Sequence, residues 1–394
     1  AGVSVSTGTS NVIVGGLAGD SITTGANNVA IGYNSLSTED TGGKNTAIGW
    51  GTLTNLDAGA DAYNVAIGYN AANDMTTALQ SVVIGGFAGD AITTGSYNIA
   101  IGYNALTAET GANRNTAIGY FALSAQNKGS GDANNVAIGH SAGQNVSTGI
   151  QNVIIGNNAG DALTTANYNV AIGYSALSGE DAHGSVVAIG YGALATQNAG
   201  AESYNVAIGY DAGLNVTTGT SNTLIGAAAG DALTTGPYNV AIGRSALSTE
   251  DAHGYNIAIG AFALLNQDAG DNAFNTAVGY QAGTAITTGI ENTLIGGDTG
   301  AALTTGTRNT LLGRAAGYVL TGENNTFLGR RAGYTATTGD LNICVGSGAD
   351  LSAATVSNEV NIYNGTVTAR FQGAAAAWSF VSDERDKKEI KDLE

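Results

Sequence analysis

The chain has 394 residues, of which 60 are glycine and one is proline, and 43% are hydrophobic. This composition differs from that of an ordinary globular domain, and the Val, Ile and Thr residues between the glycines argue against a disordered coil. The net charge of −18 argues against binding to nucleic acid or to an anionic membrane, because both need a basic surface. No apolar run reaches the ~18 residues needed to span a bilayer, so membrane insertion is not expected.

A short motif of the form Asn-Val-Ala-Ile-Gly recurs along almost the whole chain. Its glycines are mostly 17 residues apart and define twenty coils between Gly15 and Gly346. One coil in four is longer, with 19 or 20 residues, and these longer coils end at Gly68, Gly139, Gly209 and Gly279. Four coils thus form a block of about 70 residues, and a fixed period of this kind predicts a solenoid.

Each coil carries the same local pattern. Val29 lies three residues before a coil glycine and Ile31 one residue before it. These two side chains share one face of a predicted strand, and Ala30 lies on the opposite face. Because alanine permits close approach, we expect the Ala-rich face to lie against another chain or sheet. Asn stands four residues before the glycine in eighteen of the twenty coils, which predicts a ladder of stacked amides.

Two glycine corners are expected in each coil, one at the strand end and one in Thr-Thr-Gly segments such as residues 23–25. Two corners imply two strands per coil. A 17-residue coil is too short for a three-sided β-helix, so we predict an all-β, flattened parallel β-roll over residues 1–350. Such a thin roll buries little of its own surface, which favours a homotrimer.

The repeat over roughly residues 8–350 resembles the head domains of trimeric autotransporter adhesins. Their left-handed parallel β-rolls end in the same Ala-Ile-Gly phrase, although their coils are usually shorter. The resemblance implies a left-handed roll and a trimer. Residues 351–381 are expected to form a β neck, with short strands at 360–363 and 367–371. The chain begins inside the repeat, so we expect a further segment to precede it.

The segment from Trp378 to Lys388 resembles the junction that opens the intramolecular chaperone of endosialidase-type phage tail spikes and fibres. In that family a Ser and a Lys five residues later form a self-cleaving dyad. The resemblance implies that Ser382 is the nucleophile, Lys387 is its base, and the bond between Val381 and Ser382 is cleaved. Residues 382–394 would be only the start of the chaperone, so we expect the dyad to be inactive in this chain.

Residues 139–143 have the Gly-x-Ser-x-Gly form of a hydrolase nucleophile elbow, with Ser141 at its centre. The repeat explains this segment better, because residues 209–213 and 279–283 occupy the same position without a serine at the centre. His183 and His253 lie in Glu-Asp-Ala-His-Gly loops, where metal binding is conceivable but a surface role is favoured. We expect no enzyme activity, no cofactor and no metal.

Four aspartates recur once per block after Ala-Gly: Asp20, Asp90, Asp161 and Asp231. They faintly resemble calcium-binding repeats, but four coils of stacking would separate them by roughly 19 Å, too far to share an ion. Solvated corners are the favoured interpretation, and a site on a trimer axis is the alternative. Aromatic residues directly follow many coil glycines and predict a column that packs or stacks as a ladder, or else binds sugars: Tyr33, Trp50, Tyr69, Tyr103, Tyr120, Tyr174, Tyr191, Tyr210 and Tyr280.

These patterns favour a structural protein of a phage or phage-like particle, a trimeric tail-fibre shaft or head in the virion. Its expected partners are further copies of itself, other tail proteins and a glycan or protein receptor on the host surface. The alternative is the head of a bacterial trimeric surface adhesin. A polysaccharide depolymerase would need paired carboxylates in a groove, and no such cluster stands out from the repeat.

Overall fold

A computed structural model describes residues 1–372 of the chain, which divides into two compact units. The first unit is Ala1–Ala273 and the second begins at Phe274. The strands of the first unit are β1 (Val12–Val14), β2 (Val29–Ile31), β3 (Thr46–Ile48), β4 (Val65–Ile67), β5 (Val82–Ile84), β6 (Ile99–Ile101), β7 (Ala112–Asn113), β8 (Thr116–Ile118), β9 (Gly131–Asp132), β10 (Val136–Ile138), β11 (Val153–Ile155), β12 (Val170–Ile172), β13 (Val187–Ile189), β14 (Val206–Ile208), β15 (Thr223–Ile225), β16 (Val240–Ile242) and β17 (Ile257–Ile259). Those of the second unit are β18 (Thr276–Val278), β19 (Thr293–Ile295), β20 (Thr310–Leu312), β21 (Thr326–Leu328), β22 (Ile343–Val345), β23 (Glu359–Tyr363) and β24 (Thr368–Gln372).

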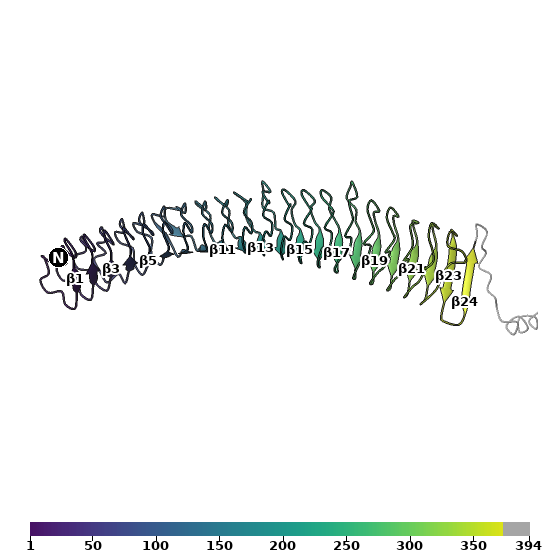
Figure 1. Ribbon diagram of the computed structural model, residues 1–394, viewed down its shortest axis with the longest axis horizontal. Coiled ribbons are helices and arrows are strands. Elements are labelled where there is room, and N and C mark those ends of the chain that lie inside the picture. The colour runs from purple at the N-terminus through teal and green to yellow at the C-terminus, as the bar shows by residue number, and fades with distance from the viewer. Residues whose placement is uncertain (373–394) are drawn as a thin grey trace, which may run out of the picture. The chain divides into compact units, whose positions relative to one another are not determined.

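The predicted solenoid is confirmed in both units. Each coil contributes one three-residue strand, and successive strands pair in parallel and in register. Val12 pairs with Val29 and Val14 with Ile31, for example. Within each unit of Figure 1, these strands follow one another as a row of short arrows along one side of the coils. About 21 coils are stacked in this way, some 17 residues apart.

The prediction of two strands per coil was wrong. The Thr-Thr-Gly side of the coil forms stacked turns, and among residues 1–372 β7 with β9 is the only strand pair outside the main sheet. The amides of Thr23, Thr24 and Gly25 converge on one acceptor, the carbonyl of Asp40 in the next coil. A regular ladder would give each amide its own carbonyl, so this geometry stacks the coils without forming a second sheet.

The expectation for the Ala-rich face was also wrong. Ala30, Ala171 and Ala188, at the centres of their strands, are fully buried inside the single chain. The valine and isoleucine on either side of each alanine face outward and are only partly covered. The narrow coil interior admits a small central side chain, so the alanines pack within the coil and not against another chain.

The glycine that ends each strand is required by the stacking. Gly190 has a φ of +137°, and a Cβ atom at this position would lie 2.2 Å from the carbonyl oxygen of Gly209 in the next coil. Both the left-handed backbone and the close approach exclude a side chain. The same relation links Gly313 to Gly329 in the second unit.

The predicted asparagine ladder is present, but the amides contact the main chain of the next coil. Asn222 Oδ1 accepts a hydrogen bond from the amide of Asn239 at 2.8 Å, and its Nδ2 donates to the Gly236 carbonyl at 2.9 Å. Asn222 thus satisfies two main-chain groups one coil ahead, and Asn292 makes the same pair of contacts. Val186 interrupts the ladder. Its main-chain amide donates to Asn169 Oδ1, but the valine side chain offers no acceptor to the amide of the next coil.

The second unit ends with a hairpin. β23 pairs in parallel with β22, and β24 then pairs antiparallel with β23. Glu359 occupies the asparagine position of this last coil, and its amide donates to Asn342 Oδ1 at 3.0 Å. The Glu359 carboxylate contacts Arg370 Nε at 3.0 Å and the amide of Ser352 at 3.0 Å. The ladder therefore ends at Glu359, and both strands predicted for the neck are present.

Candidate functional site

The proposed self-cleavage residues Ser382 and Lys387 lie outside the described residues, so that dyad stays a prediction. Ser141, at the centre of the elbow-like segment, is almost buried and takes a φ of +54°. Asp211 and Gln281 take φ values of +52° and +54° at the same coil position. Ser141 is therefore one instance of a recurrent corner of the repeat.

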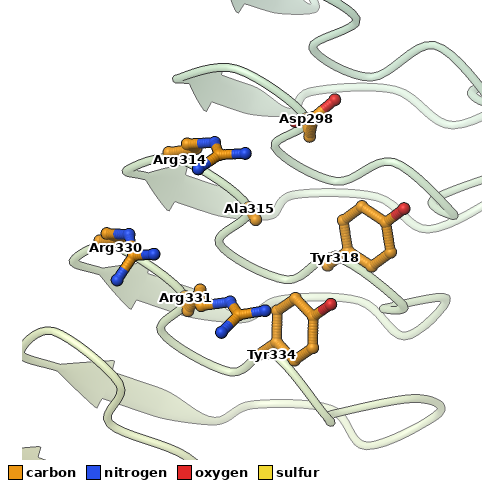
Figure 2. A pocket seen from close by; sticks show the side chains of 7 residues that line it. All are labelled: Asp298, Arg314, Ala315, Tyr318, Arg330, Arg331 and Tyr334. Atoms are coloured by element: carbon orange, nitrogen blue, oxygen red, sulfur yellow. The ribbon is translucent and has the colours of Figure 1, made fainter.

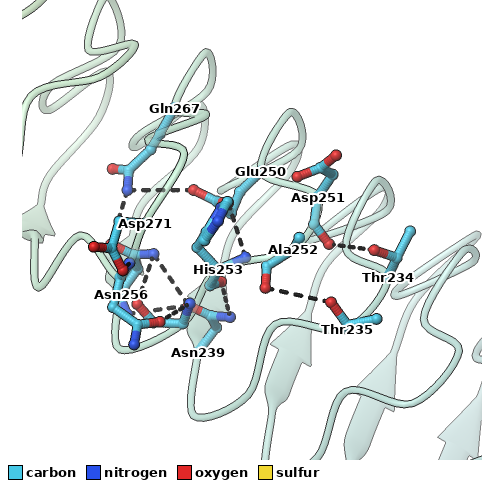
Figure 3. A network of polar contacts seen from close by, with 12 residues as sticks. Thr234, Thr235, Asn239, Glu250, Asp251, Ala252, His253, Asn256, Gln267 and Asp271 are labelled. Atoms are coloured by element: carbon cyan, nitrogen blue, oxygen red, sulfur yellow. Dashed lines mark hydrogen bonds and ion pairs between the residues drawn. The ribbon is translucent and has the colours of Figure 1, made fainter.

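Two loops bring histidine and carboxylates together. In one, potential ligand atoms of Glu250, Asp251, His253 and Asp268 lie within 4.8 Å of one another, and Glu180, Asp181 and His183 form a smaller group of the same kind. Glu250 is fully buried, and its Oε1 accepts a hydrogen bond from the His253 amide and lies 3.1 Å from Nδ1 of the same residue (Figure 3). These contacts show a hydrogen-bonded loop whose buried carboxylate already has protein partners.

The buried glutamate has a structural role that the sequence did not suggest. Glu39 stands seven residues after its coil glycine, at a position that elsewhere holds core residues such as Ile22 or Leu233. Its Oε2 accepts from the Ala58 amide at 3.2 Å, inside the extended coil that follows. Three further buried glutamates precede the other extended coils: Glu109, Glu180 and Glu250.

The extended coils and the glutamates occur together. Glu109 accepts from the Lys128 amide at 3.3 Å and Glu180 from the Ala199 amide at 3.4 Å. In the second unit Leu320 occupies this position, and the coil that follows has no extension. The carboxylate thus holds amides of the longer loop, which would otherwise be unsatisfied. An acidic residue at a position otherwise held by core residues was the sequence signal for this role.

Burial raises the pKa of the Glu250 carboxyl above its ordinary value of 4.5, although hydrogen bonds from His253 and from the Ala269 backbone act in the opposite direction. Burial likewise raises the pKa of Glu39. The corner aspartates Asp90, Asp161 and Asp231 also have raised pKa values, and desolvation is the main cause. They are half-buried at the corners, so they are less solvated than expected.

The aromatic column stacks between coils of the first unit. Tyr174, Tyr191 and Tyr210 form a continuous run with ring centroids 5.2 and 5.1 Å apart, and about half of each side chain stays exposed. Trp50 stacks on Tyr69 at 4.9 Å in the same way. This geometry matches the predicted ladder. A second set of exposed aromatic residues, just before the ladder asparagines, was not recognised in the sequence: Tyr63, Tyr97, Tyr168, Tyr204, Tyr238, Tyr255 and Phe274.

The second unit carries a different surface. A cleft of about 240 Å³ is lined by three arginines, two tyrosines, an aspartate and an alanine (Figure 2): Arg314, Arg330, Arg331, Tyr318, Tyr334, Asp298 and Ala315. The rings of Tyr318 and Tyr334 stack with centroids 5.3 Å apart. The Arg331 guanidinium lies 4.4 Å from the centroid of the Tyr334 ring. We refer to this group as the Arg–Tyr cleft.

Comparison with family models, with curated proteins and with solved structures found no match to this chain. The resemblances in the repeat and at the C-terminal junction therefore remain expectations from the sequence. Among residues 1–372, no helix has the length and apolar character needed to cross a membrane.

Proposed function

We propose that this chain is a structural fibre component of a phage or phage-like particle, that it assembles as a homotrimer, and that it supports attachment to a host. The observation that carries the proposal is the outer strip, which we define as the first and third residues of the parallel strands. These side chains are mainly Val, Ile and Thr, and the single chain leaves them half-buried or exposed.

Pairing in register aligns like side chains into columns. Val136 pairs with Val153 and Ile138 with Ile155, and the alignment continues through the following strands. Leu312 in the second unit is 45% exposed. A long apolar surface on a soluble protein is typical of an association site.

A second copy of the chain is the partner that best fits the outer strip. Every copy carries the strip with the same period, so like columns can meet along their length. The resemblance to trimeric adhesin heads and tail fibres supports three copies.

The assembly state tests the proposal directly. Light scattering coupled to size-exclusion chromatography at micromolar concentration is expected to give three times the chain mass of 39.0 kDa. A monodisperse monomer would refute the trimer.

The interface is tested by the double variant Val187→Lys and Ile189→Lys. Both side chains belong to the outer strip, so buried charge should dissociate the trimer while far-UV circular dichroism stays unchanged. Ala182→Lys places one lysine on an exposed turn of the same coil, away from the strip, and should leave the assembly intact. A trimer that persists in the double variant would show that the strip is not the interface.

The alternative, an adhesin head on a bacterial surface, shares the repeat and the trimer. The two functions differ in what would follow Glu394. A helical chaperone of roughly a hundred residues would support the fibre, whereas a membrane anchor would contradict it. Sequencing the gene beyond this segment decides between them.

A further inference from the structure

The Arg–Tyr cleft is built where the chain departs from its own repeat. Arg314 and Arg330 directly follow coil glycines, the position that Tyr174 and Tyr191 hold in the first unit. Tyr318 stands five residues after its glycine, where the first unit places Asp, Ser or Thr in most coils. The main-chain frame of the coil does not need these exchanges, because the same corners form in both units with either set of side chains.

The cleft concentrates positive charge on a strongly acidic chain. Four of the thirteen Lys and Arg residues lie between Arg308 and Arg331. Arg308 pairs with Glu323 at 3.4 Å and is neutralised. No ion pair within residues 1–372 includes Arg314, Arg330 or Arg331. Three exposed guanidinium groups thus have no carboxylate within ion-pair distance and can present their donors to an incoming anion.

The stacked tyrosines indicate which group the ligand should carry besides its anion. Arg331 lies over the face of Tyr334, and this contact holds the guanidinium beside the ring pair. The Tyr318 and Tyr334 rings offer apolar faces with hydroxyl groups at their edges, as Figure 2 shows. This combination of an aromatic surface and nearby hydroxyls suits the C–H face and the hydroxyl groups of a sugar ring.

Asp298 adds a hydrogen-bond acceptor to the cleft. Its carboxylate lies on the cleft wall, on the preceding coil from Arg314 and Ala315 (Figure 2). A sugar hydroxyl can donate a hydrogen bond to this group. The wall thus offers donors for one carboxylate and an acceptor for neighbouring hydroxyls.

We propose that the Arg–Tyr cleft is a binding site for an acidic saccharide, a sugar unit that bears a carboxylate. The guanidinium groups of Arg330 and Arg331 bind the carboxylate, the tyrosine pair stacks against the ring, and Asp298 accepts from a hydroxyl. All lining residues belong to one chain, so the site does not depend on the trimer. It would give the proposed fibre a contact with the host surface, but it can bind or fail to bind whatever the assembly state.

The test measures binding of trigalacturonate to the full chain by isothermal titration calorimetry at low ionic strength. Maltotriose serves as the neutral control and inorganic phosphate as the free anion. Trigalacturonate is expected to bind at least roughly tenfold more tightly than either control. Equal binding of maltotriose would overturn the role of charge, tighter binding of phosphate would overturn the role of the sugar, and no binding of trigalacturonate would overturn the site.

Variants assign the binding to the cleft. Arg330→Ala with Arg331→Ala should weaken trigalacturonate binding by roughly tenfold or more, and Tyr334→Ala should weaken it by a smaller factor. Arg308→Ala and Arg244→Ala are the matched controls, since the first removes a paired arginine of the same unit and the second an arginine at the equivalent coil position of the first unit. Binding that responds equally to a control variant would contradict the assignment. Thermal melting checks that each variant is folded.

Discussion

The two units of the chain share the corner glycines and the ladder asparagines. They differ in side chains at the strand centres and on the exposed surface. Gly190 and Gly313 stand at the same corner with φ values of +137° and +131°. The centre of the strand, in contrast, is Ala188 in the first unit and the much larger Phe327 in the second, and both are buried. The exposed residue after the coil glycine is tyrosine at Tyr174 and Tyr191 of the first unit and arginine at Arg314 and Arg330 of the second. In a stacked repeat, glycine and asparagine therefore fix the fold, while core size and surface chemistry can change from coil to coil.

The largest effect is expected at the corner glycine, which both units share. Gly190→Ala and Gly313→Ala should each lower the free energy of unfolding by at least about 3 kcal/mol, because the new Cβ meets a main-chain carbonyl and the backbone is strained. Gly200→Ala is the control, since a Cβ there has no neighbour within 4 Å, and it should cost about 1 kcal/mol. Urea denaturation measures all three. If alanine were tolerated in one unit only, the two units would not share the same requirement for glycine at this corner.

The ladder asparagine should show the next largest effect, again in both units. Asn222→Ala and Asn292→Ala each leave a buried amide and a buried carbonyl without their side-chain partner, which should cost about 2–4 kcal/mol. Cys344 reports on the second unit, because it is buried and burial raises the pKa of its thiol to about 12. Thiol labelling of Cys344 should therefore accelerate in Asn292→Ala and stay slow in Asn222→Ala.

The interruption at Val186 provides the reverse experiment. Val186→Asn would supply an acceptor to the amide of Asn205 in the next coil and should raise the stability of the first unit by about 1 kcal/mol. Thermal unfolding compared with the wild type measures the gain. An equal or lower midpoint would mean that the ladder asparagines do not act as independent supports.

Buried carboxyls should give the first unit a characteristic pH dependence. The pKa values of Glu39 and Glu250 are raised in the folded state, so their charged forms oppose folding. Their contribution is most favourable below the ordinary value of 4.5 and is lost as the pH rises through the folded pKa. Stability should therefore increase on mild acidification from neutrality. In Glu250→Gln the free energy of unfolding should depend less on pH, as measured by urea denaturation between neutrality and mild acid. A stronger pH dependence in that variant would contradict the predicted direction.

The smallest effect on stability is expected at the exposed column. Tyr191→Ser removes two stacking contacts and should cost about 1 kcal/mol. Arg330→Ser at the equivalent position of the second unit should change stability by less than about 0.5 kcal/mol. A large loss of stability in Arg330→Ser would show that the arginines are part of the frame and not of a binding surface.

The sequence predicted the coil register well, because glycine and asparagine occupy positions where few other residues satisfy the main chain. It did not show which face of the strand points inward. A period of two assigns Ala30 and Ile31 to opposite faces, and the small size of alanine is compatible with either an interchain contact or a narrow interior. The second strand was overpredicted because Thr-Thr-Gly resembles a strand followed by a corner, whereas its amides converge on one carbonyl.

The sites were harder to predict than the fold. The role of Glu39 and Glu109 was not predicted, and Glu180 and Glu250 were considered only as parts of the histidine loops, since these contacts lie in the following coil and depend on its extension. The Arg–Tyr cleft combines residues one, two and five positions after the glycine from successive coils, so no single motif contains it. Aligning each coil with the repeat reveals the glutamates as departures at one coil position and the cleft as departures at several.

The ladder of asparagines also has a direction, because the Oδ1 atom of a ladder asparagine such as Asn222 accepts from the main-chain amide of the coil that follows it in the chain. One ladder position does not limit how many can follow. After the gap at Val186 the series continues to Glu359, which uses its carboxylate for Arg370 and Ser352. Insertion of another four-coil block before Glu359 would extend the stack by roughly 19 Å and leave the terminal hairpin unaltered. Gene duplication alone can therefore lengthen such a protein while its terminal hairpin stays the same.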